Sequence, residues 1–272
     1  MSRRELEDLF HQLLDAVKKE HASNLRVDFD QNPFRNLKRR FIIAHAPRVG
    51  SHLLCEGLLA YGASVEEIFE EPRVKNISKR SGFFSLQEYC EWIVSKHAID
   101  GVFGVSGEYK VLAPLEIGGE LPDFISDWRF VYLKRLDFVG QAVSELIARG
   151  TRAFKSSTTP IKSLSEQDYD AQTIARFIDR SLAINAAWEG AFSCYGVEPL
   201  RLTYEELTAD PSGVVANAAA FLDLGGPPIT HEWLRSPPLQ KQATTLNLTW
   251  AMRFREENQA FCHAREAGFF EL

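Results

Sequence analysis

The 272-residue sequence lacks long apolar runs and has only four cysteines. No stretch approaches the roughly 18 consecutive apolar residues that a membrane-spanning helix needs. The cysteines are scattered and form no CxxC pair, which disfavours a metal knuckle and favours reduced thiols buried as small apolar side chains. We therefore expect no transmembrane segment, no metal site and a reducing environment.

The sequence also lacks an excess of positive charge, because 31 Lys and Arg stand against 37 Asp and Glu, for a net charge of −6. This balance disfavours nucleic acids and acidic membranes as partners, so an anionic ligand must be met by a local basic pocket. Residues 1–8 are charged throughout and contain no apolar core of a signal peptide. The expected location is the cytoplasm.

The remaining composition, 45% hydrophobic and 25% charged, is ordinary for a globular protein of one large domain or of a domain with an appendage. Apolar residues at helical intervals predict a helix over residues 4–20, and a polar connector follows to residue 38. We therefore divide the chain into an N-terminal helical extension, 1–38, and a main domain, 39–272.

Strands and helices are expected to alternate through most of the main domain. Apolar segments predict strands at 40–46, 101–107, 128–135 and 198–204. Helical spacing predicts helices at 85–99, 136–149, 171–195 and 211–224. Their ends are indicated by a Ser85–Glu88 capping box, Asp137 in the first turn of the second helix, Gly196 after the third and Pro211 at the start of the fourth. This alternation predicts an α/β fold with a central parallel sheet flanked by helices.

The turn after the first strand, in "RRFIIAHAPRVGSHLLCEGL", has the features of an anion site. A strand-to-helix turn leaves the first N–H groups of the helix unpaired at the carboxyl edge of the sheet, where open α/β sheets bind ligands. Gly50 permits close approach of the backbone, Arg48 can grip phosphate oxygens, and Ser51 and His52 add donors. The turn lacks the lysine of a Walker A loop and the glycines of a dinucleotide fingerprint. An ordinary βα turn with an incidental Gly and Arg is the alternative.

A second basic position follows the strand predicted at 128–135. Arg135 stands at its end, and Ser144 comes nine residues later in the next helix. Both side chains can converge on one phosphate from two sides. The alternative is a solvated strand-end charge and a tolerated helical serine.

Three segments resemble the sulfotransferases that use 3′-phosphoadenosine 5′-phosphosulfate (PAPS), and most closely the bacterial trehalose 2-sulfotransferase type. They are "AHAPRVGSHLLCEGL", "FVYLKRLDFVGQAVSELIA" and "GVEPLRLTYEELTADP", in that order and spacing. The resemblance covers about residues 40–255 and implies a P-loop NTPase-like sulfotransferase fold. It also implies PAPS as co-substrate, adenosine 3′,5′-bisphosphate as product, and a homodimer as one oligomeric state.

The resemblance assigns roles to the candidate residues. The loop formed by Arg48, Val49, Gly50, Ser51 and His52 would hold the 5′-phosphosulfate. Arg135 and Ser144 would hold the 3′-phosphate, and Lys241 would add a late phosphate contact from the C-terminal segment. Sulfuryl transfer resembles phosphoryl transfer, so Arg48 would supply the fixed positive charge that a Walker lysine gives elsewhere.

Within "VEEIFEEP", Glu67 aligns with the glutamate that serves the trehalose type as base, and Glu66 and His52 are its substitutes. The alternative is that this acidic run is a solvated helix face. Two departures from the family pattern concern activity. His52 stands where the pattern has threonine, and Ser106 stands where related enzymes are expected to carry a lysine, for which Lys110 would have to compensate.

These observations predict a sulfotransferase that moves a sulfuryl group from PAPS to a hydroxyl of a carbohydrate or glycolipid. Two alternatives stay open. One is a catalytically altered, nucleotide-binding relic of the same fold, which the His52 and Ser106 departures favour. The other is a P-loop small-molecule kinase, which the missing Walker lysine disfavours.

Overall fold

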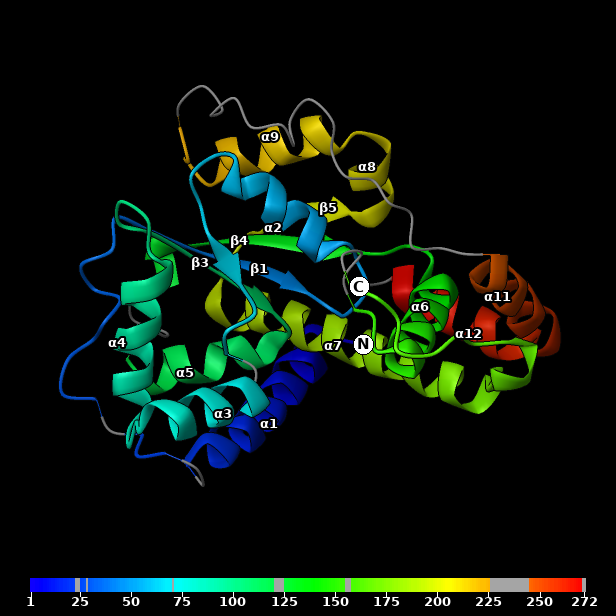
Figure 1. Ribbon diagram of the computed structural model, residues 1–272, viewed down its shortest axis with the longest axis horizontal. Coiled ribbons are helices and arrows are strands. Elements are labelled where there is room, and N and C mark those ends of the chain that lie inside the picture. The colour runs from blue at the N-terminus through cyan, green and yellow to red at the C-terminus, as the bar shows by residue number, and fades with distance from the viewer. Residues whose placement is uncertain are drawn as a thin grey trace.

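A five-stranded parallel sheet forms the centre of the protein (Figure 1). The computed structural model describes residues 1–22, 25–27, 29–69, 71–119, 125–154, 158–225 and 245–270. The strand order is β2-β3-β1-β4-β5, and all four neighbouring pairs are parallel. The strands are β1 (Arg39–His45), β2 (Val65–Glu66), β3 (Val102–Gly107), β4 (Trp128–Lys134) and β5 (Leu200–Thr203). The predicted α/β fold with a central parallel sheet is confirmed.

Both faces of the sheet are buried, as the apolar sequence of the central strands requires. In β1, Phe41 and Ile43 point into the hydrophobic cluster on one face, whereas Ile42 and Ala44 point into the cluster on the other. Successive side chains of a strand point to opposite faces, so a run of apolar residues needs cover on both sides.

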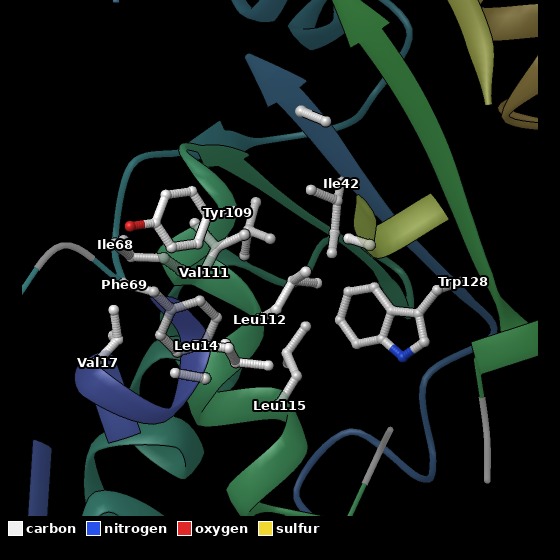
Figure 2. Packing of buried hydrophobic residues seen from close by; sticks show 14 of the residues in the cluster. Leu14, Val17, Ile42, Ile68, Phe69, Tyr109, Val111, Leu112, Leu115 and Trp128 are labelled. Atoms are coloured by element: carbon white, nitrogen blue, oxygen red, sulfur yellow. The ribbon is translucent and has the colours of Figure 1, made fainter. Parts of the chain in front are cut away.

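One face is covered by α2 (Ser51–Leu59), α8 (Tyr204–Ala209) and α9 (Pro211–Phe221) (Figure 1). The other face carries a larger helical layer, whose apolar packing Figure 2 shows in part. Its helices are α1 (Arg3–Ala22), α3 (Glu71–Ser81), α4 (Leu86–His97), α5 (Leu112–Ile117) and α7 (Ala171–Tyr195). A third cluster joins the first half of α7 to α6 (Phe138–Thr151), α11 (Thr245–Glu257) and α12 (Gln259–Phe270).

The expected helix boundaries are present with their capping chemistry. Ser85 and Glu88 form the capping box of α4, Gly196 ends α7 in the left-handed conformation with φ 63°, and Pro211 opens α9. Asp137 is the N-cap of α6 and accepts a hydrogen bond from the N–H of Gly140. It therefore lies just before the helix, whereas the sequence predicted it in the first helical turn. These local signals determine where the elements begin and end.

Three parts of the chain differ from the sequence-based expectation. The last strand ends at Thr203, and Tyr204 begins α8, because Thr203 and Glu206 form a capping box there. The short elements β2, α3 and α5 were not predicted. The acidic segment around Glu67 is therefore not a helix face: β2 ends at Glu66, and α3 begins at Glu71.

The N-terminal helix α1, predicted as part of an extension, packs against α7 and contributes Phe10, Leu14 and Val17 to the larger core cluster. Gly190 permits this contact, because a Cβ there would lie 2.3 Å from the carbonyl oxygen of Leu6. Three short 3-10 turns, η1 (Tyr109–Val111), η2 (Ile125–Asp127) and η3 (Glu166–Asp168), lie in the connections. Among the helices of the described segments, none is long and apolar enough to cross a membrane.

The buried His21 makes the stability of α1 dependent on pH. Its Nε2 has no hydrogen-bond partner among the described residues, and burial lowers the pKa of the imidazole. The folded protein therefore disfavours the protonated ring, whereas the unfolded chain protonates near the ordinary pKa of about 6.5. Stability from this group is present above that pH and is lost as the pH falls through it.

We predict that His21→Leu reduces the loss of unfolding free energy between pH 7.5 and pH 5.5 relative to the unaltered protein. Urea denaturation at both pH values measures the difference, and exposed His263, changed to Gln, serves as the control. An identical loss in the unaltered protein and in His21→Leu would show that His21 does not cause the acid sensitivity.

Candidate functional site

The carboxyl ends of β1, β4 and β5 bring the predicted anion-binding residues together. The turn after β1 carries Arg48 and Gly50, the end of β4 leads to Arg135, and Tyr204 follows β5 directly. Because all five strands are parallel, these ends meet at one edge of the sheet. This is the edge at which open α/β sheets bind their ligands.

Arg48 is fixed in this turn by its backbone and by its side chain. Its φ of 65° is left-handed, which costs a non-glycine residue about 1–2 kcal/mol and needs support from its surroundings. Its Nε donates to the Ser144 hydroxyl at 3.1 Å, and its Nη1 donates to the carbonyl of Phe154 at 2.7 Å. The turn itself is held by Gln141, whose Nε2 donates to the carbonyl of Pro47 at 2.6 Å.

The structure therefore joins Arg48 and Ser144, a pair that the sequence did not predict. Ser144 was expected beside Arg135, but its hydroxyl accepts from Arg48. Gln141 was missed entirely. The available signal is the spacing of three residues between Gln141 and Ser144, which places both on one face of α6 toward the turn.

The other loop residues present their backbone rather than their side chains. Val49 is buried in the apolar cluster beneath α2, and Ser51 is buried at the start of that helix. Gly50 is the N-cap, with φ 83°, and offers no side chain to cap the first N–H groups. His52 is the second residue of α2 and is half-buried.

Arg135 lies against Tyr204, the residue that also contacts this turn. Its guanidinium carbon is 4.5 Å from the centroid of the Tyr204 ring, in a cation–π arrangement. A Cβ on Gly50 would lie 3.0 Å from Cδ2 of the same ring. Tyr204 therefore contacts both arginine-bearing segments.

The two guanidinium groups are close enough to influence one another. Burial lowers the pKa of Arg48, and the positive charge of Arg135 lowers it further, whereas Glu145 opposes both effects. Arg135 is 15% exposed and lies 3.4 Å from Asp137, yet its buried Nε has no hydrogen-bond partner among the described residues. An unsatisfied donor on one half-buried cation, beside a second half-buried cation, is a favourable position for a bound anion.

The segment "YEEL" supports this arrangement with three consecutive side chains. Tyr204 supplies the shared ring, and the carboxylate of Glu205 accepts from the backbone N–H groups of Leu136 and Asp137 at 3.1 and 3.2 Å. Glu206 completes the capping box of α8. The first turn of α8 therefore fixes the backbone that carries Arg135.

On the other side of β1, Glu67 lies beside a buried histidine. The Oε1 of Glu67 is 3.8 Å from Nε2 of His45, and the same nitrogen is 2.8 Å from the Ser106 hydroxyl. Ser106, predicted to replace a family lysine, is buried in this contact. Lys110, expected to compensate, lies 3.9 Å from Glu108 and is 42% exposed. His45 was not predicted from the sequence.

Glu66 and Glu67 have different surroundings. Arg73 of α3 binds the Glu66 carboxylate at 3.4 Å and donates to the main-chain carbonyl of Glu67 at 3.2 Å. The Glu67 carboxylate instead faces His45, and its charge weakly opposes the lowering of the Arg48 pKa that burial causes. Of the two carboxylates, Glu67 is therefore the one coupled to the arginine turn. Lys241 lies outside the described residues.

Gly50 offers a direct test of the contact with Tyr204. Gly50→Ala must adopt a left-handed conformation and also displace the ring, whereas Gly62→Ala has a similar φ of 81° and no atom within 4 Å. We expect both variants to lose about 1 kcal/mol of unfolding free energy from backbone strain, and Gly50→Ala to lose about 1 kcal/mol more. Equal losses in chemical denaturation would show that the ring does not constrain the turn.

Comparison with known proteins identifies a family through the second half of the chain. The model of the Stf0 sulphotransferase family matches residues 118–257, which include Arg135 and Ser144 but not the turn after β1. Trehalose 2-sulfotransferase of Mycolicibacterium smegmatis is 29% identical over 134 residues, 49% of this chain and 48% of that protein. The chain thus matches about half the length of that relative.

A crystal structure of a sulfotransferase from Alicyclobacillus acidocaldarius is also similar. It has 15% identity and a TM-score of 0.48, and the match covers 85% of this chain and 94% of that one. The family match spans slightly more than half of the chain, and the expected resemblance is confirmed at that level. The chain belongs to the Stf0 sulphotransferase family.

Proposed function

We propose that this protein transfers a sulfuryl group from PAPS to a hydroxyl of a carbohydrate or glycolipid. The products would be a sulfate ester and adenosine 3′,5′-bisphosphate. Membership of a sulphotransferase family supports the reaction class. The observation that carries the choice of donor is that Arg48 and Arg135 stand at the same edge of the sheet and influence one another, with Tyr204 in contact with both segments.

The residues fit a nucleotide with two separate anionic groups. The turn from Arg48 to His52 would hold the 5′-phosphosulfate through backbone N–H groups, the positive end of α2 and the Arg48 guanidinium. Arg135 would hold the 3′-phosphate through its Nε, a donor that has no partner in the part of the chain that the structure describes. The Ser144 hydroxyl, which accepts a hydrogen bond from Arg48, would donate its own hydrogen to one of the two phosphates.

The bound donor would supply an activated sulfuryl group with a phosphate leaving group, so the protein's task is positioning and charge stabilisation. Arg48 supplies a permanent positive charge, because a guanidinium remains protonated even when burial lowers its pKa. Its bonds to Ser144 and Phe154 fix that charge in place before the donor arrives. A preorganised charge is worth more than one that must reorient during the reaction.

Glu67 would act as the general base that takes the proton of the acceptor hydroxyl. Its carboxylate is 30% exposed, so an acceptor can reach it, and its charge is felt at Arg48. Glu66 is a weaker candidate, because Arg73 already binds its carboxylate. The similarity to a trehalose 2-sulfotransferase favours a sugar hydroxyl as acceptor.

The donor assignment predicts a selective thermal shift. Adenosine 3′,5′-bisphosphate should stabilise the protein more than AMP or ATP does at the same concentration. At about 100 times its Kd it should raise the free energy of unfolding by about 2.7 kcal/mol relative to the protein without ligand. Arg135→Ala should abolish the preference for the 3′-phosphorylated nucleotide over AMP while AMP still binds. Equal stabilisation of the unaltered protein by AMP and adenosine 3′,5′-bisphosphate would refute a specific 3′-phosphate site.

The assignment of the base predicts unequal effects of two neighbouring substitutions. Glu67→Gln should lower kcat with PAPS and a carbohydrate panel by about 10²–10⁴-fold, because it removes the proton acceptor. Glu66→Gln, the matched control, should change kcat less than about threefold, and both should bind adenosine 3′,5′-bisphosphate normally. Full activity in Glu67→Gln would exclude this carboxylate as the base.

The same assays distinguish the two alternatives. Selective binding of adenosine 3′,5′-bisphosphate without transfer to any acceptor would indicate a nucleotide-binding relic. Magnesium-dependent phosphoryl transfer from ATP would indicate a kinase. Magnesium-independent sulfuryl transfer is the result that the proposal predicts.

A further inference from the structure

His45, at the end of β1, has a defined tautomer. Its side chain is 4% exposed, and its Nδ1 lies 2.9 Å from the carbonyl oxygen of Ala46, which can only accept a hydrogen bond. Nδ1 therefore carries the hydrogen of the neutral ring, and Nε2 is an acceptor. The Ser106 hydroxyl, 2.8 Å away, donates to that nitrogen.

A third group, the Glu67 carboxylate, faces the same nitrogen. Oε1 of Glu67 is 3.8 Å from Nε2, which is too long for a hydrogen bond. Between an ionised carboxylate and a neutral acceptor nitrogen, this approach offers no attraction. It becomes favourable when one proton lies between the two groups, on the carboxyl or on the ring.

The side chains around His45 and Glu67 do not compete for this proton. Burial raises the pKa of the Cys55 thiol of α2 to about 12, so it stays protonated at neutral pH. On the other side, Arg73 binds the Glu66 carboxylate and the Glu67 carbonyl, which leaves the Glu67 carboxylate directed toward the ring.

We propose that His45 is a positioning residue that orients Glu67 and holds the proton that Glu67 removes from the acceptor hydroxyl. The inference rests on the proposed function, in which Glu67 is the base. The acceptor O–H bond breaks as the proton moves to the Glu67 carboxylate, and the hydroxyl oxygen attacks sulfur. The Ser106 hydroxyl then turns from donating to Nε2 to accepting from it, and the carboxyl O–H bond breaks as an N–H bond forms with the freed lone pair of Nε2.

The result is an ionised Glu67 beside an imidazolium, an ion pair at the observed separation. The partly exposed side of Glu67 lets the proton return to water after the sulfate ester leaves. No oxidant, reductant or metal enters this balance. A histidine held only by Ser106 and Ala46 would fill a structural role, and the approach of Glu67 is what distinguishes this one.

The coupling is measurable without substrate. The Cε1–H resonance of His45 in the NMR spectrum at about pH 7, assigned by its loss in His45→Gln, should change position in Glu67→Gln, because the carboxylate faces the ring. Glu66→Gln is the matched control and should leave the resonance in place. An unchanged resonance in Glu67→Gln would overturn the pairing.

Enzyme kinetics distinguish a role of His45 in proton transfer from a purely structural role. The amide of His45→Gln can still accept from Ser106 but cannot hold the proton, so kcat should fall about tenfold or more. KM for PAPS and stabilisation by adenosine 3′,5′-bisphosphate should stay unchanged. Wild-type kcat in His45→Gln would overturn the proton role. Absence of transfer by the unaltered protein, with the NMR coupling intact, would count against the proposed function and not against the pairing.

Discussion

The contact of the Tyr204 ring with both Gly50 and Arg135 is the interaction on which the candidate site depends. It joins the turn after β1 to the end of β4, two segments that the chain separates by some 85 residues. The neighbouring Glu205 reinforces the junction by accepting from two backbone N–H groups beside Arg135. Because Gly50 alone leaves room for the ring, the turn and the ring constrain one another.

This junction holds like charges together in a partly dehydrated setting. Burial and the charge of Arg135 both lower the pKa of Arg48, and one nitrogen of Arg135 has no partner among the described residues. Such an arrangement costs folding free energy, which a ligand with two anionic groups can offset when it binds. The folded protein is less stable as a result, but its hydrogen-bond donors are already in position for the ligand. On the other side of β1, His45 contacts the Ser106 hydroxyl and faces the Glu67 carboxylate.

The parallel sheet, its main helices and the arginine-bearing turn were predictable, because each leaves a local pattern in the sequence. Buried strands appear as apolar runs, caps as Ser85, Gly196 and Pro211, and the turn as a glycine between a strand and a helix. The contacts across the sheet were not predictable. Ser144 was expected beside Arg135 and lies against Arg48, and His45 was unremarked because a histidine at the end of an apolar run has no periodic signature. Such pairings depend on strand order, which alternation alone does not determine.

A crystal structure of the complex with adenosine 3′,5′-bisphosphate would show whether the two arginines bind one nucleotide. We predict a single nucleotide whose 5′-phosphate lies on the first N–H groups of α2 beside Arg48 and whose 3′-phosphate contacts Arg135. A nucleotide bound with both phosphates on one arginine, or at another edge of the sheet, would contradict it.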